Sequence, residues 1–171
     1  IISDVNLCYS EHARRYLNAS GVAKERTYVT GSPMAEVLHE NLPCIEASDI
    51  HKRLGLEKGR YILLSAHREE NIDTERNFVS LFTAINSMAQ KYDMPILYSC
   101  HPRSRNRLAA SQFKLDHRVI QHEPLGFHDY NCLQMNAFAV VSDSGTLPEE
   151  SSFFTSVGHP FPAVCIRTST E

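Results

Sequence analysis

The sequence lacks the features of a membrane or secreted protein. No apolar run reaches the roughly 18 residues that a membrane span needs, and no charged segment followed by an apolar one opens the chain as a signal peptide would. Positive charge is also scarce, because 17 Lys and Arg are outnumbered by 20 Asp and Glu, for a formal net charge of -3. A nucleic-acid backbone is normally bound by a clustered positive face. We therefore expect a soluble, cytoplasmic protein that binds neither nucleic acid nor membrane, whereas a small anionic ligand is not excluded.

Residue patterns typical of metal or disulfide sites are missing too. The five cysteines are odd in number, lie far apart and form no C-x-x-C pair. They are Cys8, Cys44, Cys100, Cys132 and Cys165. The spacing of His117, His122 and His128 puts no two of them on one helical face. We expect reduced, mostly buried thiols and no bound metal.

The length bounds the number of domains. With 171 residues, 42% of them hydrophobic, the chain suffices for one globular core and is too short for two full domains. Residues 1–7 begin inside an apolar, strand-like run without a polar lead-in. We therefore expect a piece of a longer chain, in which residues 1–20 end a first domain and residues 21–171 form a second.

Apolar runs and helical patterns alternate along the chain. Strands are expected at 5–9, 27–30, 61–66, 95–100, 119–122, 137–142 and 163–167. Helices are expected at 11–19, 34–38, 49–54, 78–88, 103–113, 130–135 and 147–154, and residues 40–48, which contain Pro43, are expected to be a connection. Such alternation predicts parallel β-α-β units, and the continuously apolar run 61–66 predicts a sheet covered on both faces. The expected fold class is α/β, a doubly wound, Rossmann-like parallel sheet.

Polar residues cluster directly after the predicted strands, where ligands bind in such sheets. Residues 65–71 carry His67, Arg68, two carboxylates and Asn71, and residues 101–105 form a basic cluster. Residues 142–150 place small hydroxyl residues and a glycine at the start of a helix. The free amides of a first helical turn favour an anion, so this corner is a candidate phosphate site.

Each segment also has a purely structural explanation. Taken alone, Ser144 is better explained by helix capping, the commoner role of a serine before a helix, and the helix dipole accounts for Glu149 and Glu150. His67 is also explained as a loop-holding histidine, and Arg103, Arg105 and Arg107 as a solvated helix face. A serine hydrolase built from Ser144, His67 and Asp143 is disfavoured because the G-x-S-x-G turn is absent.

Taken together, these segments resemble a known enzyme family, the non-hydrolysing UDP-N-acetylglucosamine 2-epimerases. That family has H-R-x-E-N after one strand, D-S-G-G-x-x-E-E after a later one, and a terminal T-E-R-P-E. The corresponding segments here are H-R-E-E-N at 67–71, D-S-G-T-L-P-E-E at 143–150 and S-T-E at 169–171. Residues 29–33 and 3–13 are similar to two further family segments, V-T-G-N-T and S-D-x-x-x-x-x-T-E-x-A.

The resemblance implies two Rossmann-like domains, as in B-type glycosyltransferases, with a UDP-sugar between them and UDP held by the second domain. It implies that Ser144, Gly145 and Thr146 bind the diphosphate, that Glu150 binds the ribose hydroxyls, and that Tyr130 stacks near the uracil. His67 and Arg68 would lie by the diphosphate, with His67 as the catalytic group that stabilises or protonates departing UDP. Glu70 and Asn71 complete the implied UDP-binding set.

The implied reaction eliminates UDP across C1 and C2 of a UDP-linked 2-acetamido sugar and adds it back with C2 inverted, without a cofactor or metal. Fixed donors at the leaving diphosphate stabilise the charge that develops there, and proton transfer requires placed carboxylates. The sequence of residues 65–73 is similar to that of one branch of the family, which acts on UDP-linked 6-deoxy sugars. In that branch the L-talo compound is converted to UDP-N-acetyl-L-fucosamine for capsules and O-antigens. A homodimer is implied by the family alone.

Departures from the family pattern limit how many of the family's residue roles can be assigned to this chain. Thr146 replaces the second glycine of D-S-G-G, so its side chain must turn away from the phosphates, and Leu125 replaces a glutamine that often meets the uracil. Glu69 and the segment 101–104 put an allosteric sugar-nucleotide site in doubt. The first domain is missing, so we expect weak UDP binding and no turnover. A glycosyltransferase nucleotide domain and a non-catalytic UDP-sugar-binding module remain alternatives.

Overall fold

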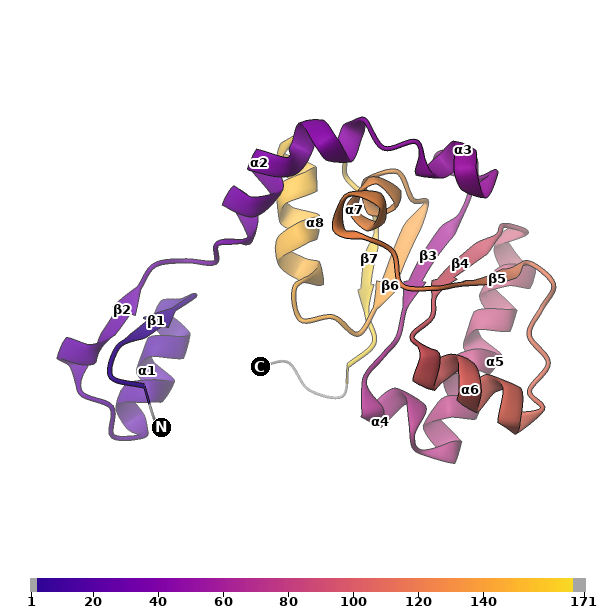
Figure 1. The fold of residues 1–171 in the computed structure, drawn as a ribbon. Coiled ribbons are helices and arrows are strands. Elements are labelled where there is room, and N and C mark those ends of the chain that lie inside the picture. Colours follow the sequence, from indigo (N-terminus) through magenta and orange to yellow (C-terminus); the bar gives the residue numbers. More distant parts are fainter. Residues whose placement is uncertain (1–2, 168–171) are drawn as a thin grey trace.

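The computed structural model describes residues 3–167, apart from the side chains of Glu69, Glu70 and Arg103 (Figure 1). In chain order the elements are β1 (Asn6–Cys8), α1 (Glu11–Ala19), the 3-10 helix η1 (Lys24–Arg26), β2 (Thr27–Val29), α2 (Met34–Glu46), α3 (Ile50–Leu54), β3 (Ile62–Ser65), α4 (Glu69–Ile72), α5 (Glu75–Tyr92), β4 (Ile96–Ser99), α6 (Pro102–Ser111), β5 (Val119–His122), α7 (Phe127–Met135), β6 (Ala139–Ser142), α8 (Leu147–Ser156) and β7 (Ala163–Cys165).

A small unit forms from the first two strands and the helix between them. β1 pairs in parallel with β2, Asn6 beside Thr27, so residues on both sides of position 20 share one sheet. α1 begins where expected, because the amide of Ala13 donates to the hydroxyl of Ser10 at 3.2 Å. Figure 1 shows this unit standing apart from the rest and joined to α2 by an extended segment. In that segment the hydroxyl of Ser32 donates to the carboxylate of Glu149 on α8.

The large unit is a five-stranded parallel sheet with the strand order β5-β4-β3-β6-β7. From β3 the chain builds outward to β4 and β5, and then returns to add β6 and β7 on the other side of β3. This reversal leaves a crevice at the carboxyl ends of β3 and β6, the usual ligand position in open parallel sheets. The expected doubly wound, Rossmann-like fold is confirmed.

Helices cover both faces of the large sheet, with an apolar core on each side (Figure 1). One core joins α2, α3, α7 and α8 to alternate strand residues and includes Leu38, Ile45, Leu63, Leu97, Val140 and Phe154, each fully buried. The other joins α5 and α6 to the opposite face and includes Phe78, Phe82, Ile85, Ile62, Leu64 and Tyr98. Alternation of side chains along the strands assigns one set to each face. The helix expected at 78–88 is therefore confirmed within the longer α5, and its buried side chains form one apolar face.

Two local predictions were wrong. Residues 40–48 were expected to be a connection, but α2 continues to Glu46 with Pro43 inside it. An internal proline costs a helix about 3 kcal/mol, and the packing of Leu38 and Ile45, both 0% exposed, offsets this cost. The loop after β3 contains the short helix α4, which propensity did not indicate.

The cysteines are free thiols, of which Cys8, Cys100 and Cys132 are buried and Cys44 and Cys165 are exposed. Among residues 3–167, no helix has the length and apolar character to cross a membrane. In the same residues, no group of three or more His, Cys, Asp or Glu side chains is arranged to hold a metal ion.

Candidate functional site

The site lies where the carboxyl ends of β3 and β6 meet. Ser65 and Ser142 end these strands side by side in the parallel register. Ser65 is 7% exposed and Ser142 is fully buried, so the ends of the two strands are covered. The loops that follow them form the surface of the site. The segments 65–71 and 142–150, separate in the sequence, are thereby brought together.

Asp143 ties the two loops to each other. Its carboxylate accepts hydrogen bonds from the backbone amides of His67 and Arg68, both at 2.8 Å, and from the side-chain amide of Asn71 at 3.1 Å. The Arg68 guanidinium donates a hydrogen bond to the backbone carbonyl of Asp143 at 3.0 Å, and the side chain of Asn71 also donates to the carbonyl of Ile166. With Asp143 only 2% exposed, this carboxylate fixes the backbone of the histidine loop.

The imidazole of His67 lies beside two polar groups. Its Nε2 atom is 3.0 Å from the hydroxyl of Ser65, and its ring lies 6.2 Å from that of His101. Loss of hydration lowers the pKa of His67, an effect that the charge of Asp143 opposes and His101 reinforces. The ring is therefore neutral at pH 7 and meets a ligand as a hydrogen-bond donor or acceptor, not as a fixed cation.

The second loop leads into α8. The helix begins at Leu147 with Thr146 as its N-cap, and Pro148 lies in the first turn, where its missing N–H has no partner to lose. Ser144 is therefore not the cap. Its hydroxyl accepts a bond from the Thr146 amide at 3.3 Å, and its own amide donates to the Ser142 hydroxyl at 3.0 Å.

The side chain of Thr146 turns toward Glu150 and Ser144. Its hydroxyl donates to the Glu150 carboxylate at 2.6 Å and lies 2.9 Å from the hydroxyl of Ser144. The other oxygen of Glu150 accepts from the side-chain amide of Gln134 on α7 at 2.7 Å. Tyr130 lies one turn before Gln134, and burial raises its pKa to about 12. Gln134 thus joins α7 to Glu150 of α8, whereas the hydroxyl of Tyr130 is hydrogen-bonded to Ser65 and Ser142 at the strand ends.

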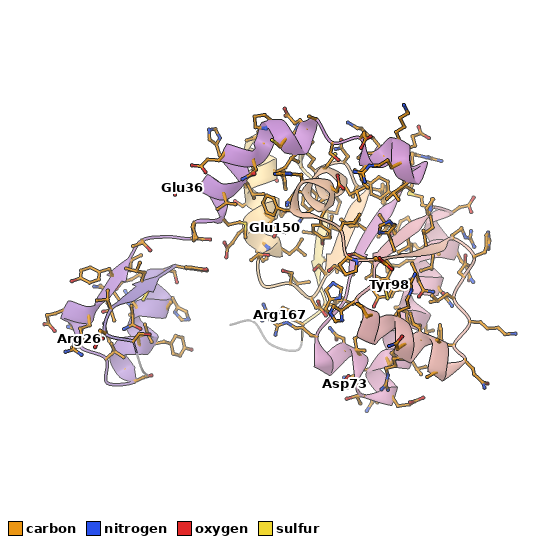
Figure 2. The ribbon with its side chains drawn as sticks, in the orientation of Figure 1. Arg26, Glu36, Asp73, Tyr98, Glu150 and Arg167 are labelled. Atoms are coloured by element: carbon orange, nitrogen blue, oxygen red, sulfur yellow. The ribbon has the colours of Figure 1, made fainter. Side chains whose placement is uncertain are left out.

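A cleft of about 410 Å³ adjoins the start of α8. It is lined by Tyr9, Ser144, Gly145, Thr146, Pro148, Glu149, Cys165 and Arg167. A Cβ atom on Gly145 would lie 3.0 Å from a terminal nitrogen of Arg167, so a larger residue would push the end of that flexible side chain away from the turn. Figure 2 shows Glu150 and Arg167 on the side of the large unit nearer to the small one.

The predicted site residues are thus only partly gathered in one place. Ser144, Gly145 and Thr146 share the cleft, whereas His67, Arg68, Tyr130 and Glu150 are not among the side chains that line it. The side chain of Glu70 and the S-T-E segment at 169–171 lie outside the described residues. The disfavoured hydrolase arrangement does not form, because Asp143 binds the backbone of the histidine loop while Ser144 faces Thr146.

Two residues of the site were not singled out from the sequence for their actual roles. Asp143 was named in the D-S-G segment and in a disfavoured hydrolase triad but given no role of its own, although an acid at a strand end is well placed to bind amides of a neighbouring loop. Gln134 lies in a mostly apolar helix and was not noticed. A neutral amide at a core-facing helix position is the signal that would have found it.

Comparisons with known proteins identify the family and the fold. A family model described as UDP-N-acetylglucosamine 2-epimerase matches residues 1–171. The UDP-N-acetylglucosamine 2-epimerase of Methanococcus maripaludis is 28% identical over 179 residues, which cover 99% of this chain and 47% of that protein. The chain therefore spans about half the length of the curated relatives it matches.

Two solved structures are similar over 99% of the chain. The UDP-N-acetylglucosamine 2-epimerase of Rickettsia bellii is 37% identical with a TM-score of 0.85, and the chain covers 44% of it. The Methanocaldococcus jannaschii enzyme, solved in complex with UDP-GlcNAc and UDP, is 25% identical with a TM-score of 0.86, and the chain covers 47% of it. Fold, motif order and family model agree, so the chain belongs to the UDP-N-acetylglucosamine 2-epimerase family.

Proposed function

We propose that this chain is the UDP-binding part of an enzyme that inverts C2 of a UDP-linked 2-acetamido sugar by eliminating UDP and adding it back. The observation that carries the proposal is the joining of two loops through Asp143, which brings the histidine loop beside the serine-glycine turn at the start of α8. Elimination requires donors where negative charge gathers on the departing diphosphate.

The described residues suit that step. Ser144, Gly145 and Thr146 would hold the diphosphate, and Arg68 and Asn71 would support it from the neighbouring loop, with Glu70 in the same set. Because the pKa of His67 is lowered, a neutral ring would approach the ligand, and the arriving anion would favour its protonation. His67 would then donate that proton to the phosphate oxygen as the bond to C1 breaks.

The remainder of the active site would come from a first domain in the same polypeptide. Residues 1–20 would be the end of that domain, and β2 extends the same small sheet to residue 29. The exposure of Leu7 in β1 and of Tyr9 directly after it, 65% and 60%, supports this. Large apolar side chains left open in this way suit a surface that another element covers. The isolated chain would bind UDP weakly and turn nothing over, and the complete enzyme would be a cytoplasmic homodimer.

The substrate we propose is a UDP-linked 6-deoxy amino sugar, converted from the L-talo to the L-fuco form for capsule or O-antigen synthesis. The likeness of residues 65–73 to that branch supports this choice. Supplying the complete enzyme with UDP-N-acetylglucosamine and with the 6-deoxy-L-talo compound in separate assays tests it. Faster turnover of UDP-N-acetylglucosamine would contradict the substrate and leave the reaction type standing.

The reaction itself is tested in heavy water. An epimerase of this type incorporates deuterium at C2 of the UDP-sugar without an acceptor, and a His67→Ala variant should lose that exchange while an exposed-residue control, His39→Ala, retains it. A glycosyltransferase would show no exchange at C2 and would need an acceptor. In a non-catalytic binding module, His67→Ala would change affinity alone. Either of the last two results would overturn the proposal.

A further inference from the structure

Gln134 is an unusual residue for the place it occupies. It lies in α7 with 0% of its surface exposed, between Leu133 and Met135 of the apolar core. Its amide nitrogen donates to Glu150 at 2.7 Å, but its amide oxygen has no hydrogen-bond partner among the described residues. Leaving a buried polar atom unpaired costs about 1–3 kcal/mol. Fold stability alone would favour an apolar side chain, so the glutamine is explained by its effect on Glu150.

The direction of the neighbouring hydrogen bonds follows from which groups carry protons. An ionised carboxylate can only accept, so Thr146 donates to Glu150 and Gln134 donates to its other oxygen. The single hydroxyl proton of Thr146 is then used. Ser144 must be the donor in the 2.9 Å contact between the two hydroxyls. One directed chain therefore runs from Ser144 through Thr146 to Glu150, with Gln134 donating from the far side.

This chain leaves Glu150 with free acceptor capacity on each oxygen. A carboxylate offers about four acceptor positions, and each oxygen has one filled from within the protein. Glu150 is half-buried, so the remaining positions can meet a ligand. Two oxygens of one carboxylate, each with a free acceptor position, match two adjacent hydroxyl groups that both donate. Without the two internal donors the carboxylate would rotate about its terminal bond and lose that alignment.

We propose that Gln134 and Thr146 are positioning residues that fix the carboxylate of Glu150 for the two adjacent hydroxyls of a ribose, so that the site selects a ribonucleoside diphosphate over its 2′-deoxy counterpart. The inference rests on the proposed function, which supplies a uridine nucleotide as the ligand. Gln134 acts through Glu150 and need not touch the nucleotide itself. Thr146 would have this positioning role through its side-chain hydroxyl in addition to its place in the diphosphate site.

The test compares UDP with 2′-deoxy-UDP by calorimetric titration of the 171-residue chain. We expect the unaltered chain to prefer UDP by about tenfold, the size of one hydrogen bond to a charged group partly screened by water. Gln134→Leu and Thr146→Val should each reduce that preference to about threefold or less, because UDP loses affinity and 2′-deoxy-UDP loses little. Thr146→Ser retains a hydroxyl and should preserve most of the preference.

Matched controls separate positioning from folding. Asn131→Leu removes another buried amide of α7, one that donates to Phe127 at 2.9 Å, and Thr155→Val removes a hydroxyl from the far end of α8. Both should leave the preference for UDP unchanged, and thermal unfolding of every variant reports loss of structure.

The outcomes distinguish the two proposals. If the unaltered chain binds neither nucleotide, the proposed function falls and the inference with it. If it prefers UDP and the folded Gln134→Leu and Thr146→Val variants retain the full preference, only the positioning role is overturned. Loss of the preference in the control variants as well would also overturn it, because the effect would then be general to α7 and α8.

Discussion

Removal of the Asp143 carboxylate should loosen the histidine loop from the rest of the sheet. In Asp143→Ala the amides of His67 and Arg68 and the side chain of Asn71 lose an acceptor at 2.8, 2.8 and 3.1 Å. Each hydrogen bond to a charged group contributes about 1.5–3 kcal/mol. Because His67 is exposed and Arg68 half-buried, water replaces part of the loss. We therefore expect the free energy of unfolding to fall by about 2–4 kcal/mol, well below the full sum.

A second variant separates the charge from the shape. Asp143→Asn retains one oxygen acceptor in nearly the same volume but loses the charge, and neutral hydrogen bonds are about half as strong as charge-assisted ones. The free energy of unfolding of Asp143→Asn should fall by about 1–2 kcal/mol, which is less than the fall in Asp143→Ala. Asp4→Ala, at an exposed position, is the control and should change stability by less than about 0.5 kcal/mol.

Urea unfolding followed by circular dichroism measures these losses, and amide hydrogen exchange locates them. Exchange at His67 and Arg68 should speed up more in Asp143→Ala than exchange in β5, which lies two strands away from β3. A loss below about 0.5 kcal/mol in Asp143→Ala, or unchanged exchange at the two amides, would show that the loops hold their arrangement without this residue.

Three further changes probe the rest of the fold. Burial lowers the pKa of His51, whose ring lies 2.9 Å from the hydroxyl of Tyr61 and 3.8 Å from the sulfur of Cys132. As the pH falls through about 6.5, this histidine therefore takes up a proton in the unfolded chain before it does so in the folded one. The free energy of unfolding should decrease below that pH, and it should decrease less in His51→Gln. An equal dependence of the unfolding free energy on pH in both proteins would contradict this. Phe82→Ala, at a fully buried position, should cost about 3–5 kcal/mol in urea unfolding, and a cost below about 1 kcal/mol would contradict the assigned core. Pro43→Ala should stabilise the chain by about 2 kcal/mol in the same assay, because it removes a cost of about 3 kcal/mol in α2 but gives the unfolded chain about 1 kcal/mol of extra conformational freedom. Destabilisation would contradict this account.

Local patterns determined most of the secondary structure. The strands at 61–66, 95–100, 119–122, 137–142 and 163–167 contain β3 to β7 within their predicted ranges. The inner strands β3, β4 and β6 are almost fully buried, because a sheet covered on both faces requires uninterrupted apolar runs there, whereas β5 and β7 lie at the edges and are more exposed. Pro43 shows where such reasoning fails. The propensity of one residue is a local quantity, whereas the packing of Leu38 and Ile45 that overrides it depends on helices far along the chain.

The sequence by itself determined the fold class, the order of the motifs and the residues that end the strands, since each of these depends on side-chain type and spacing. Only the tertiary structure decided which of these residues meet. The direction of Thr146, the capture of Glu150 by Gln134 and the binding of the histidine loop by Asp143 join residues up to 76 positions apart. Hydrogen bonds between distant segments depend on strand order and register, which no local pattern encodes.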